Sequence, residues 1–288
     1  HAWSLLAHVL IRNIDAMGEV EPNSKRAERK EALLKEIETD ILPVIEAISK
    51  ESSGMDHEVV YRSTKALFLM RKGGVENIRS ARDSFDEVAK TSRGSRRTGD
   101  VILSLDMQLN DKEHAEKKAL KILATDADDP MANYIMGSLL LHRGENAAAE
   151  THLRKAISGA RHVPLAFNDL AEVLRRRGAF EEAEKMAREA VARMPKLYVA
   201  WETLGSILMA SGKSFSEAEK YIEKACELSK DASGGAADVR MLISLARVQI
   251  KRGQMLRAKG TMRVVQSRMK ELSEFERKEF EDLMKSVK

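Results

Sequence analysis

The sequence is poor in residues that crosslink or interrupt a fold. It has one cysteine, Cys226, with only 5 prolines and 16 glycines among 288 residues. A lone cysteine cannot form an intramolecular disulfide, and the scattered histidines lack zinc-ligand spacing, so we expect no disulfide framework, no metal site and no cofactor. The most apolar stretch near the start, Trp3 to Ile11, is too short to cross a bilayer, which takes about 20 residues. We expect no membrane span in this chain, and the compartment stays open.

Aromatic residues are also scarce, at 5% of the chain, which argues against a sheet-rich fold. Alanine, leucine, glutamate, lysine and arginine, all strong helix formers, make up about half of the residues. Charged residues reach 33%, a high share for a thick central core, and the two signs are interspersed to a net charge of +4. The composition predicts an elongated all-α array, and its near balance of charge argues against nucleic acid as the partner.

The glycines reveal an internal repeat. Gly144, Gly178 and Gly212 are spaced 34 residues apart, and Asn110 lies another 34 residues upstream. Glycine and asparagine readily adopt the left-handed conformation that ends a helix. An apolar stripe with helical spacing precedes each marker, and a second stripe follows it. Each 34-residue unit is therefore predicted to hold two antiparallel helices.

The best-formed unit resembles the tetratricopeptide repeat (TPR) family. The residues that match the family pattern without a gap are Phe167, Leu170, Ala171, Gly178, Ala183, Ala187, Ala190 and Pro195. The later segment from Trp201 to Gly205 matches the opening of the same pattern. The resemblance implies a right-handed α-α superhelix, a TPR solenoid, with degenerate N-terminal helices and a C-terminal capping helix.

We expect three parts in the chain. Residues 1–57 should form a degenerate helical pair in which Pro43 kinks a long helix, 58–270 the repeat array, and 271–288 a capping helix. The apolar stripe of the capping helix is predicted to contain Phe275 and Phe280. The predicted repeats are 58–95, which is degenerate, 96–129, 130–163, 164–197, 198–234 and 235–270.

Known catalytic motifs are missing from the sequence. It has no phosphate-binding loop, dinucleotide fingerprint, nucleophile elbow or paired-histidine metalloprotease helix. Cys226 falls beside a predicted buried stripe, so we interpret it as a small core residue. We therefore predict a non-enzymatic protein–protein interaction scaffold. Two alternatives stay open: an RNA-binding helical repeat protein, with arginine-rich segments 93–97 and 175–177, and a regulatory or accessory domain of a larger enzyme or envelope complex.

In TPR proteins the first helix of each unit lines a concave groove, and the resemblance implies that a peptide or protein segment binds there. The predicted ligand contacts are Tyr134, Asn168, Arg175, Arg176, Arg240 and Arg247. Tyr134 would supply a flat apolar surface, and Asn168 would pair with a backbone amide of the ligand. The arginine fork suits carboxylates, so the predicted partner carries an acidic segment.

The start of the chain carries a first-helix pattern, Trp3, Leu6 and Leu10, with no capping element before it. The end of a solenoid exposes an apolar face unless something covers it. We therefore expect the chain to be a piece of a longer protein, or to form an oligomer through this end.

Overall fold

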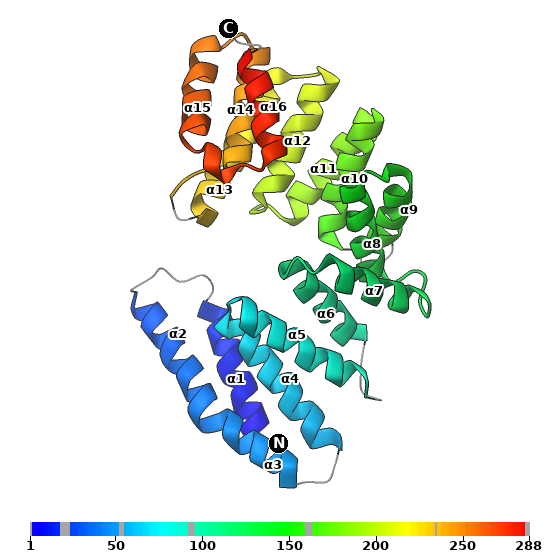
Figure 1. Cartoon of the computed structure of the whole chain (residues 1–288), viewed down its shortest axis with the longest axis vertical. Coiled ribbons are helices and arrows are strands. Elements are labelled where there is room, and N and C mark those ends of the chain that lie inside the picture. Colours follow the sequence, from blue (N-terminus) through cyan, green and yellow to red (C-terminus); the bar gives the residue numbers. More distant parts are fainter. Residues whose placement is uncertain are drawn as a thin grey trace. The chain divides into compact units, whose positions relative to one another are not determined.

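The computed structural model describes residues 2–17, 24–51, 55–91, 96–158, 163–233 and 235–285. Within these ranges most residues are helical and none lies in a strand (Figure 1). The chain divides into two compact units, His1–Thr125 and Asp126–Lys288, and each is described by itself. The predicted all-α solenoid is confirmed. The side chain of Trp3 and residues 93–95 of the first arginine-rich segment lie outside the described residues.

The second unit is a succession of helix pairs, and each first helix packs against its second helix. The pairs are α8 (Pro130–Arg143) with α9 (Asn146–Ile157), α10 (Pro164–Arg177) with α11 (Phe180–Arg193), α12 (Tyr198–Ser211) with α13 (Phe215–Ser233), and α14 (Val239–Lys251) with α15 (Met255–Ser267). Each of the second helices α9, α11 and α13 also packs against the first helix of the next pair. The short helix η2 (Met269–Glu271) and α16 (Glu274–Lys285) follow, and α16 contacts α14.

The turn glycines end the first helices as the sequence predicts. Gly144, Gly178 and Gly212 have φ values of 81°, 82° and 71°, which place all three in the left-handed region. Asn110, the marker in the first unit, has a φ of 54°. Residues with a Cβ atom rarely adopt this conformation, so the 34-residue spacing of glycine and asparagine marks where each first helix stops.

The first unit contains α1 (Ala2–Met17), α2 (Lys25–Glu36), η1 (Ile37–Ile41), α3 (Leu42–Glu51), α4 (Met55–Lys72), α5 (Val75–Ala89), α6 (Arg96–Gln108) and α7 (Lys112–Leu123). The disturbance expected at Pro43 takes the form of a π-helical turn, η1, which ends two residues before the proline. In this turn the Leu42 amide donates to the Ile37 carbonyl five residues earlier. Because proline has no N–H, one α-helical bond is lost here, and the wider turn accommodates the loss.

Charged side chains connect α5, α6 and α7. The fully buried carboxylate of Asp106 on α6 lies 2.8 Å from His114 Nδ1 on α7 and accepts a 3.4 Å hydrogen bond from Arg82 on α5. Arg82 also donates to Asp111, the N-cap of α7, at 2.7 Å. Burial raises the pKa of Asp106 even though His114 and Arg82 favour its charged form. These contacts hold the three helices together around one buried carboxylate.

The capping helix differs in one respect from the prediction. Phe280 is 2% exposed and packs with Val239 and Val265, whereas Phe275 is 71% exposed. Five residues along a helix correspond to a rotation of about 140° from the starting face, so Phe275 and Phe280 cannot share one stripe. Assigning Phe275 to the buried stripe was wrong.

The two helices of a pair approach very closely where glycine lies inside a first helix. A Cβ atom on Gly205 would lie 2.6 Å from Ile222 Cγ1 and 3.0 Å from the Ala218 carbonyl oxygen, both on α13. A Cβ atom on Gly137 would lie 2.6 Å from Leu153 Cγ on α9. Such distances are shorter than real Cβ contacts, so glycine is required at both positions.

We predict that Gly205→Ala destabilises the protein by about 1–2 kcal/mol, because overpacking outweighs the better helix propensity of alanine. The matched control is Gly260→Ala in α15, where an added Cβ meets nothing within 4 Å. This control should be neutral or stabilising by up to about 1 kcal/mol. Urea unfolding of both variants measures the difference, and equal effects of the two substitutions would contradict the packing argument.

Candidate functional site

The first helices of the second unit lie next to one another. Helix α10 contacts both α8 and α12, and α12 also contacts α14. We call the surface formed by α8, α10, α12 and α14 the first-helix wall. All six predicted contact residues belong to it. The wall carries a buried polar centre on α8 and α10, and a cavity at the N-terminal ends of α12 and α14.

Tyr134 lies in the polar centre with most of its ring buried. Its hydroxyl hydrogen-bonds with Ser138 one turn further along α8. Burial first, and then the negative charge of Asp169, raise the pKa of Tyr134 above its ordinary value. The ring therefore offers a ligand much less surface than the sequence suggests, and the residue contributes chiefly its hydroxyl to the polar centre.

Asn168 and Asp169 follow each other on α10. Asn168 is 9% exposed, and its Nδ2 donates to Asp169 Oδ1 at 3.3 Å. Its Oδ1 is buried without a hydrogen-bond partner among the described residues. Burial raises the pKa of Asp169, while hydrogen bonds from Asn168 and Ser138 partly counteract this effect. Within the described part of the chain, the centre therefore holds a carboxylate without a bound cation and an amide oxygen without a donor.

Arg175 and Arg176 both bind Glu172 on the same helix. Arg175 donates from Nε at 2.7 Å and from Nη2 at 2.8 Å, and Arg176 donates from Nε at 2.7 Å. Arg176 also reaches the Leu141 carbonyl of α8 at 3.3 Å. Burial opposes ionisation of Glu172, but the two guanidinium groups hold its pKa below the ordinary value. The positive charge predicted here is therefore partly neutralised within the wall.

A second carboxylate lies on the wall at α12. Glu202 Oε1 accepts hydrogen bonds from Ser206 at 2.7 Å and from Ser244 of α14 at 2.8 Å. No cation binds Glu202 among the described residues, although the charge of nearby Arg175 acts on it. Together with Asp169, this residue makes the middle of the wall rich in hydrogen-bond acceptors.

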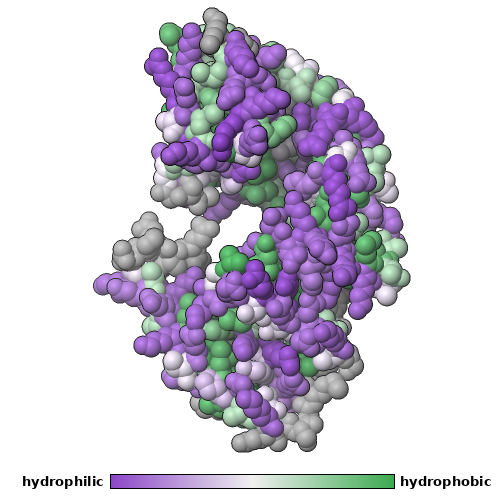
Figure 2. Space-filling view, in the orientation of Figure 1, coloured by the Kyte–Doolittle hydropathy of each residue, from purple (hydrophilic) through white to green (hydrophobic). Residues whose placement is uncertain are grey.

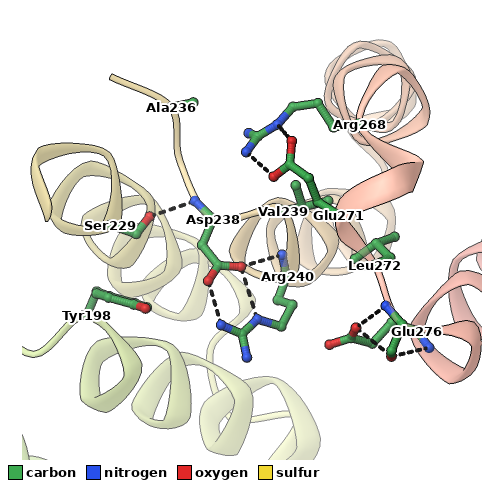
Figure 3. A pocket seen from close by; sticks show the side chains of 11 residues that line it. Tyr198, Ser229, Ala236, Asp238, Val239, Arg240, Arg268, Glu271, Leu272 and Glu276 are labelled. Carbon is green, nitrogen blue, oxygen red and sulfur yellow. Dashed lines mark hydrogen bonds and ion pairs between the residues drawn. The ribbon is translucent and has the colours of Figure 1, made fainter. Parts of the chain in front are cut away.

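The remaining two predicted arginines lie on α14. Arg240 reaches a cavity of about 530 Å³, and its Nη2 donates to Asp238 Oδ2 at 2.7 Å (Figure 3). The other residues that line the cavity are Tyr198, Ser229, Ala236, Asp238, Val239, Arg268, Glu271, Leu272, Ser273 and Glu276. In Figure 3, Arg240 pairs with Asp238 and Arg268 pairs with Glu271, whereas Glu276 accepts hydrogen bonds from Ser273. Arg247 lies two turns along α14 and approaches Glu279 of α16 at 3.5 Å.

The structure therefore places Tyr134 and Asn168 in the polar centre with Asp169, and Arg175 and Arg176 on Glu172 about two turns further along α10. Arg240 and Arg247 lie on α14 at the C-terminal end of the wall. Sequence reasoning missed Asp169, which forms the polar centre, and Asp238, which binds Arg240. Asp238 could be recognised as the N-cap of α14, since aspartate is favoured directly before a helix. Asp169 could be found only from its neighbours, because a single aspartate inside a helix has no distinctive spacing. Whether any of these residues contacts a ligand stays a prediction.

Other chemistry on the chain is sparse. Among the residues that the structure describes, no cluster of His, Cys, Asp and Glu could hold a metal ion. Cys226 is buried, and burial raises its pKa to about 12, which favours the unreactive thiol. Over the same ranges, no helix combines the length and hydrophobicity that a bilayer crossing requires.

Comparison with known proteins agrees with this architecture. Residues 165–197 match the tetratricopeptide repeat family, whereas no curated protein sequence matches the chain. A TPR protein from Parabacteroides merdae is 14% identical, with a TM-score of 0.54 and 98% of each chain covered. PilW, a type IV pilus biogenesis factor, is 18% identical, with a TM-score of 0.58, 75% of this chain and 95% of PilW covered.

A third solved structure, the human IFIT1 dimer with PPP-AAAA, is 15% identical with a TM-score of 0.56; the match covers 83% of this chain and 56% of IFIT1. At these identities the likeness is one of fold. The family match over residues 165–197 and the fold shared with a TPR protein agree with each other, so the resemblance seen in the sequence is confirmed.

The polar centre generates a pH-dependent prediction. The raised pKa of Asp169 means that folding favours its protonated form, so stability falls as the pH rises through the folded-state value. At neutral pH, Asp169→Asn should therefore raise the free energy of unfolding by on the order of 1 kcal/mol. Below about pH 4, where the unfolded carboxyl is also protonated, this gain should vanish. Urea unfolding at both pH values checks the sign, and a less stable variant at pH 7 would contradict it.

Proposed function

We propose that the chain is a non-enzymatic protein-interaction scaffold and that the first-helix wall of its second unit binds an extended peptide or protein segment. TPR proteins are generally scaffolds without catalytic activity, and the described residues contain no metal cluster. The observation that carries the proposal is the buried, unpartnered Oδ1 of Asn168 in the middle of the wall. A buried acceptor without a donor costs free energy, and a backbone N–H of a bound peptide would satisfy it after a small rotation of the amide.

The proposed ligand carries an acidic segment at the C-terminal end of the wall. Arg240 is exposed and lines the cavity, and the ion pair of Arg247 among the described residues is a 3.5 Å contact with Glu279. Arg175 and Arg176 share one carboxylate, Glu172, and Arg240 is bound by Asp238. An acidic side chain would therefore exchange with Asp238 or Glu279 rather than meet a free cation.

Asn168→Ala should weaken binding of the peptide by about tenfold, because one buried hydrogen bond is lost. The ligand is obtained by affinity capture with the whole chain, mapped to a segment by crosslinking, and titrated as a synthetic peptide. The matched control is Asn146→Ala, since Asn146 also buries an unpartnered Oδ1 but lies on the second helix α9. If both variants bind the peptide like the parent, the polar centre is not part of the binding site.

Arg240→Ala combined with Arg247→Ala should weaken binding of an acidic peptide by about tenfold or more, with helicity unchanged. Lys185→Ala combined with Lys220→Ala removes the same charge from exposed positions on the second helices α11 and α13 and serves as the control. The calorimetric Kd should respond only to the arginine pair. Equal weakening by the two pairs would indicate a general charge effect instead.

RNA binding is the rival outcome, and the human IFIT1 structure with PPP-AAAA has a similar fold. Affinity for random RNA that falls steeply with salt would favour it.

An oligomer through the N-terminal end also stays a proposal, supported by the exposed side chains of Leu5, Leu6 and Val9 on α1.

A further inference from the structure

The outer surface of α15 carries an apolar ridge that nothing in the described structure covers. Leu256, Gly260 and Val264 are spaced by four residues and so lie one above another on the helix. Leu256 is 89% exposed and Val264 is 47% exposed. Figure 1 shows α15 at the edge of the second unit, with α14 between it and α16. The ridge therefore faces away from the core of its own unit.

The same ridge is polar on the other second helices of this unit. Aligning the buried alanines Ala149, Ala183, Ala218 and Ala258 gives the equivalent positions. These are Ala147, Thr151 and Lys155 on α9, Glu181, Lys185 and Glu189 on α11, and Ser216, Lys220 and Lys224 on α13. At these positions, α9, α11 and α13 carry polar, charged or small side chains. Of the four second helices, α15 alone carries large apolar residues there.

Gly260 makes no close helix contact that would require a glycine among the described residues. Gly137 and Gly205 allow close helix packing, whereas a Cβ on Gly260 would meet no atom within 4 Å. Glycine weakens the interior of a helix relative to alanine, so an internal reason for it is normally expected. Between Leu256 and Val264 it forms a notch where another backbone can come close.

Charge supplies the third observation. Consecutive second helices are joined by ion pairs, among them Arg154 with Glu182 at 2.8 Å and Arg257 with Glu223 at 2.8 Å. On α15, Arg257 binds α13, and Lys259 lies about 200° further round the helix, on the side away from α13. Lys259 and Arg263 are exposed and have no carboxylate partner among the described residues. Helix α15 itself contains no acidic residue.

We propose that the outer face of α15, formed by Leu256, Lys259, Gly260, Arg263 and Val264, docks an amphipathic α-helix of a partner protein. The apolar side of that helix packs across the Gly260 notch, and aspartate or glutamate on its flank binds Lys259 and Arg263. The partner helix would thus form ion pairs with α15 like those that join consecutive second helices of the chain. The surface lies on second helices and is separate from the peptide site proposed on the first-helix wall.

Two other occupants fit these residues less well. A second copy of α15 would bring Lys259 and Arg263 against their own equivalents in a symmetric contact, which like charges oppose. A lipid surface prefers a broad apolar face with aromatic residues, whereas this ridge has two large apolar side chains and a notch. Both occupants are outcomes of the test below.

The test uses two libraries of helical 18-residue peptides with the same apolar ridge, one with glutamate flanks and one with lysine flanks, selected on the whole chain. Peptides from the glutamate library should bind at least about tenfold more tightly than those from the lysine library. Leu256→Glu combined with Val264→Glu should abolish this preference and weaken binding by more than about tenfold. Ala147→Glu combined with Thr151→Glu adds the same charge to the equivalent ridge of α9 and should leave binding unchanged.

Gly260→Ala separates docking from folding. It should leave the melting temperature equal or raise it, while weakening the selected peptides by about threefold or more because the backbones are forced apart. Equal binding of the two libraries, or binding unaffected by the α15 variants, overturns the proposal. So does binding to phosphatidylserine vesicles instead of peptides, or a dimer in sedimentation equilibrium that the α15 variants dissociate. Loss of binding of the selected peptides on Asn168→Ala would place them on the first-helix wall and would likewise overturn the proposal.

Discussion

The close approach of the two helices within each pair is the constraint on which the rest of the second unit depends. At Gly205 the neighbouring helix leaves no room even for a methyl group, and Ala183, Ala187 and Ala190 on α11 are completely buried. Small residues at these points set the distance between helices, and the left-handed glycines set where the chain turns back. Because both sets recur with the same period, each pair presents its first helix to the same wall and its second helix to the opposite surface.

This geometry determines how the charged residues are used. With thin layers and 33% charged residues, long side chains reach carboxylates on their own or adjacent helices, and hydrophilic residues cover most of the face seen in Figure 2. Arg175 and Arg176 are held by Glu172, and Arg240 is held by Asp238. On the wall, Asp169 and Glu202 accept hydrogen bonds from uncharged side chains and bind no cation among the described residues. The Asn168 amide oxygen has no donor there.

The sequence predicts the fold far better than it predicts the site. Turn glycines and buried alanines are governed by local backbone geometry and by contacts at fixed spacing, so Gly144 and Ala183 are recognisable without coordinates. The spacing of Glu172 with Arg175 and Arg176, three and four residues, does favour the ion pairs seen within α10. The pairing of Arg247 with Glu279 of α16 depends instead on which carboxylate lies within reach in three dimensions. Tyr134 is similar, because its burial depends on its neighbours across the wall. The response at Pro43 was foreseen in position but not in form, since a π-helical turn and a kink relieve the same missing hydrogen bond.

At the last helix pair of the array, α16 covers the apolar face, but the charged outer face of α15 has no neighbour among the described residues. Phe280 of α16 packs with Val239, Ile243 and Val265, where a further first helix would lie, so the apolar face of the last pair is covered. No second helix follows α15 among the described residues, and the ion pairs that join α9 to α11 and α13 to α15 have no continuation beyond it. Helix α16 packs on α14 and buries apolar surface there, but it brings no carboxylate to Lys259 and Arg263 of α15. The two requirements of a solenoid end, apolar cover and charge pairing, are separated here, and only the first is met within the described part of the chain.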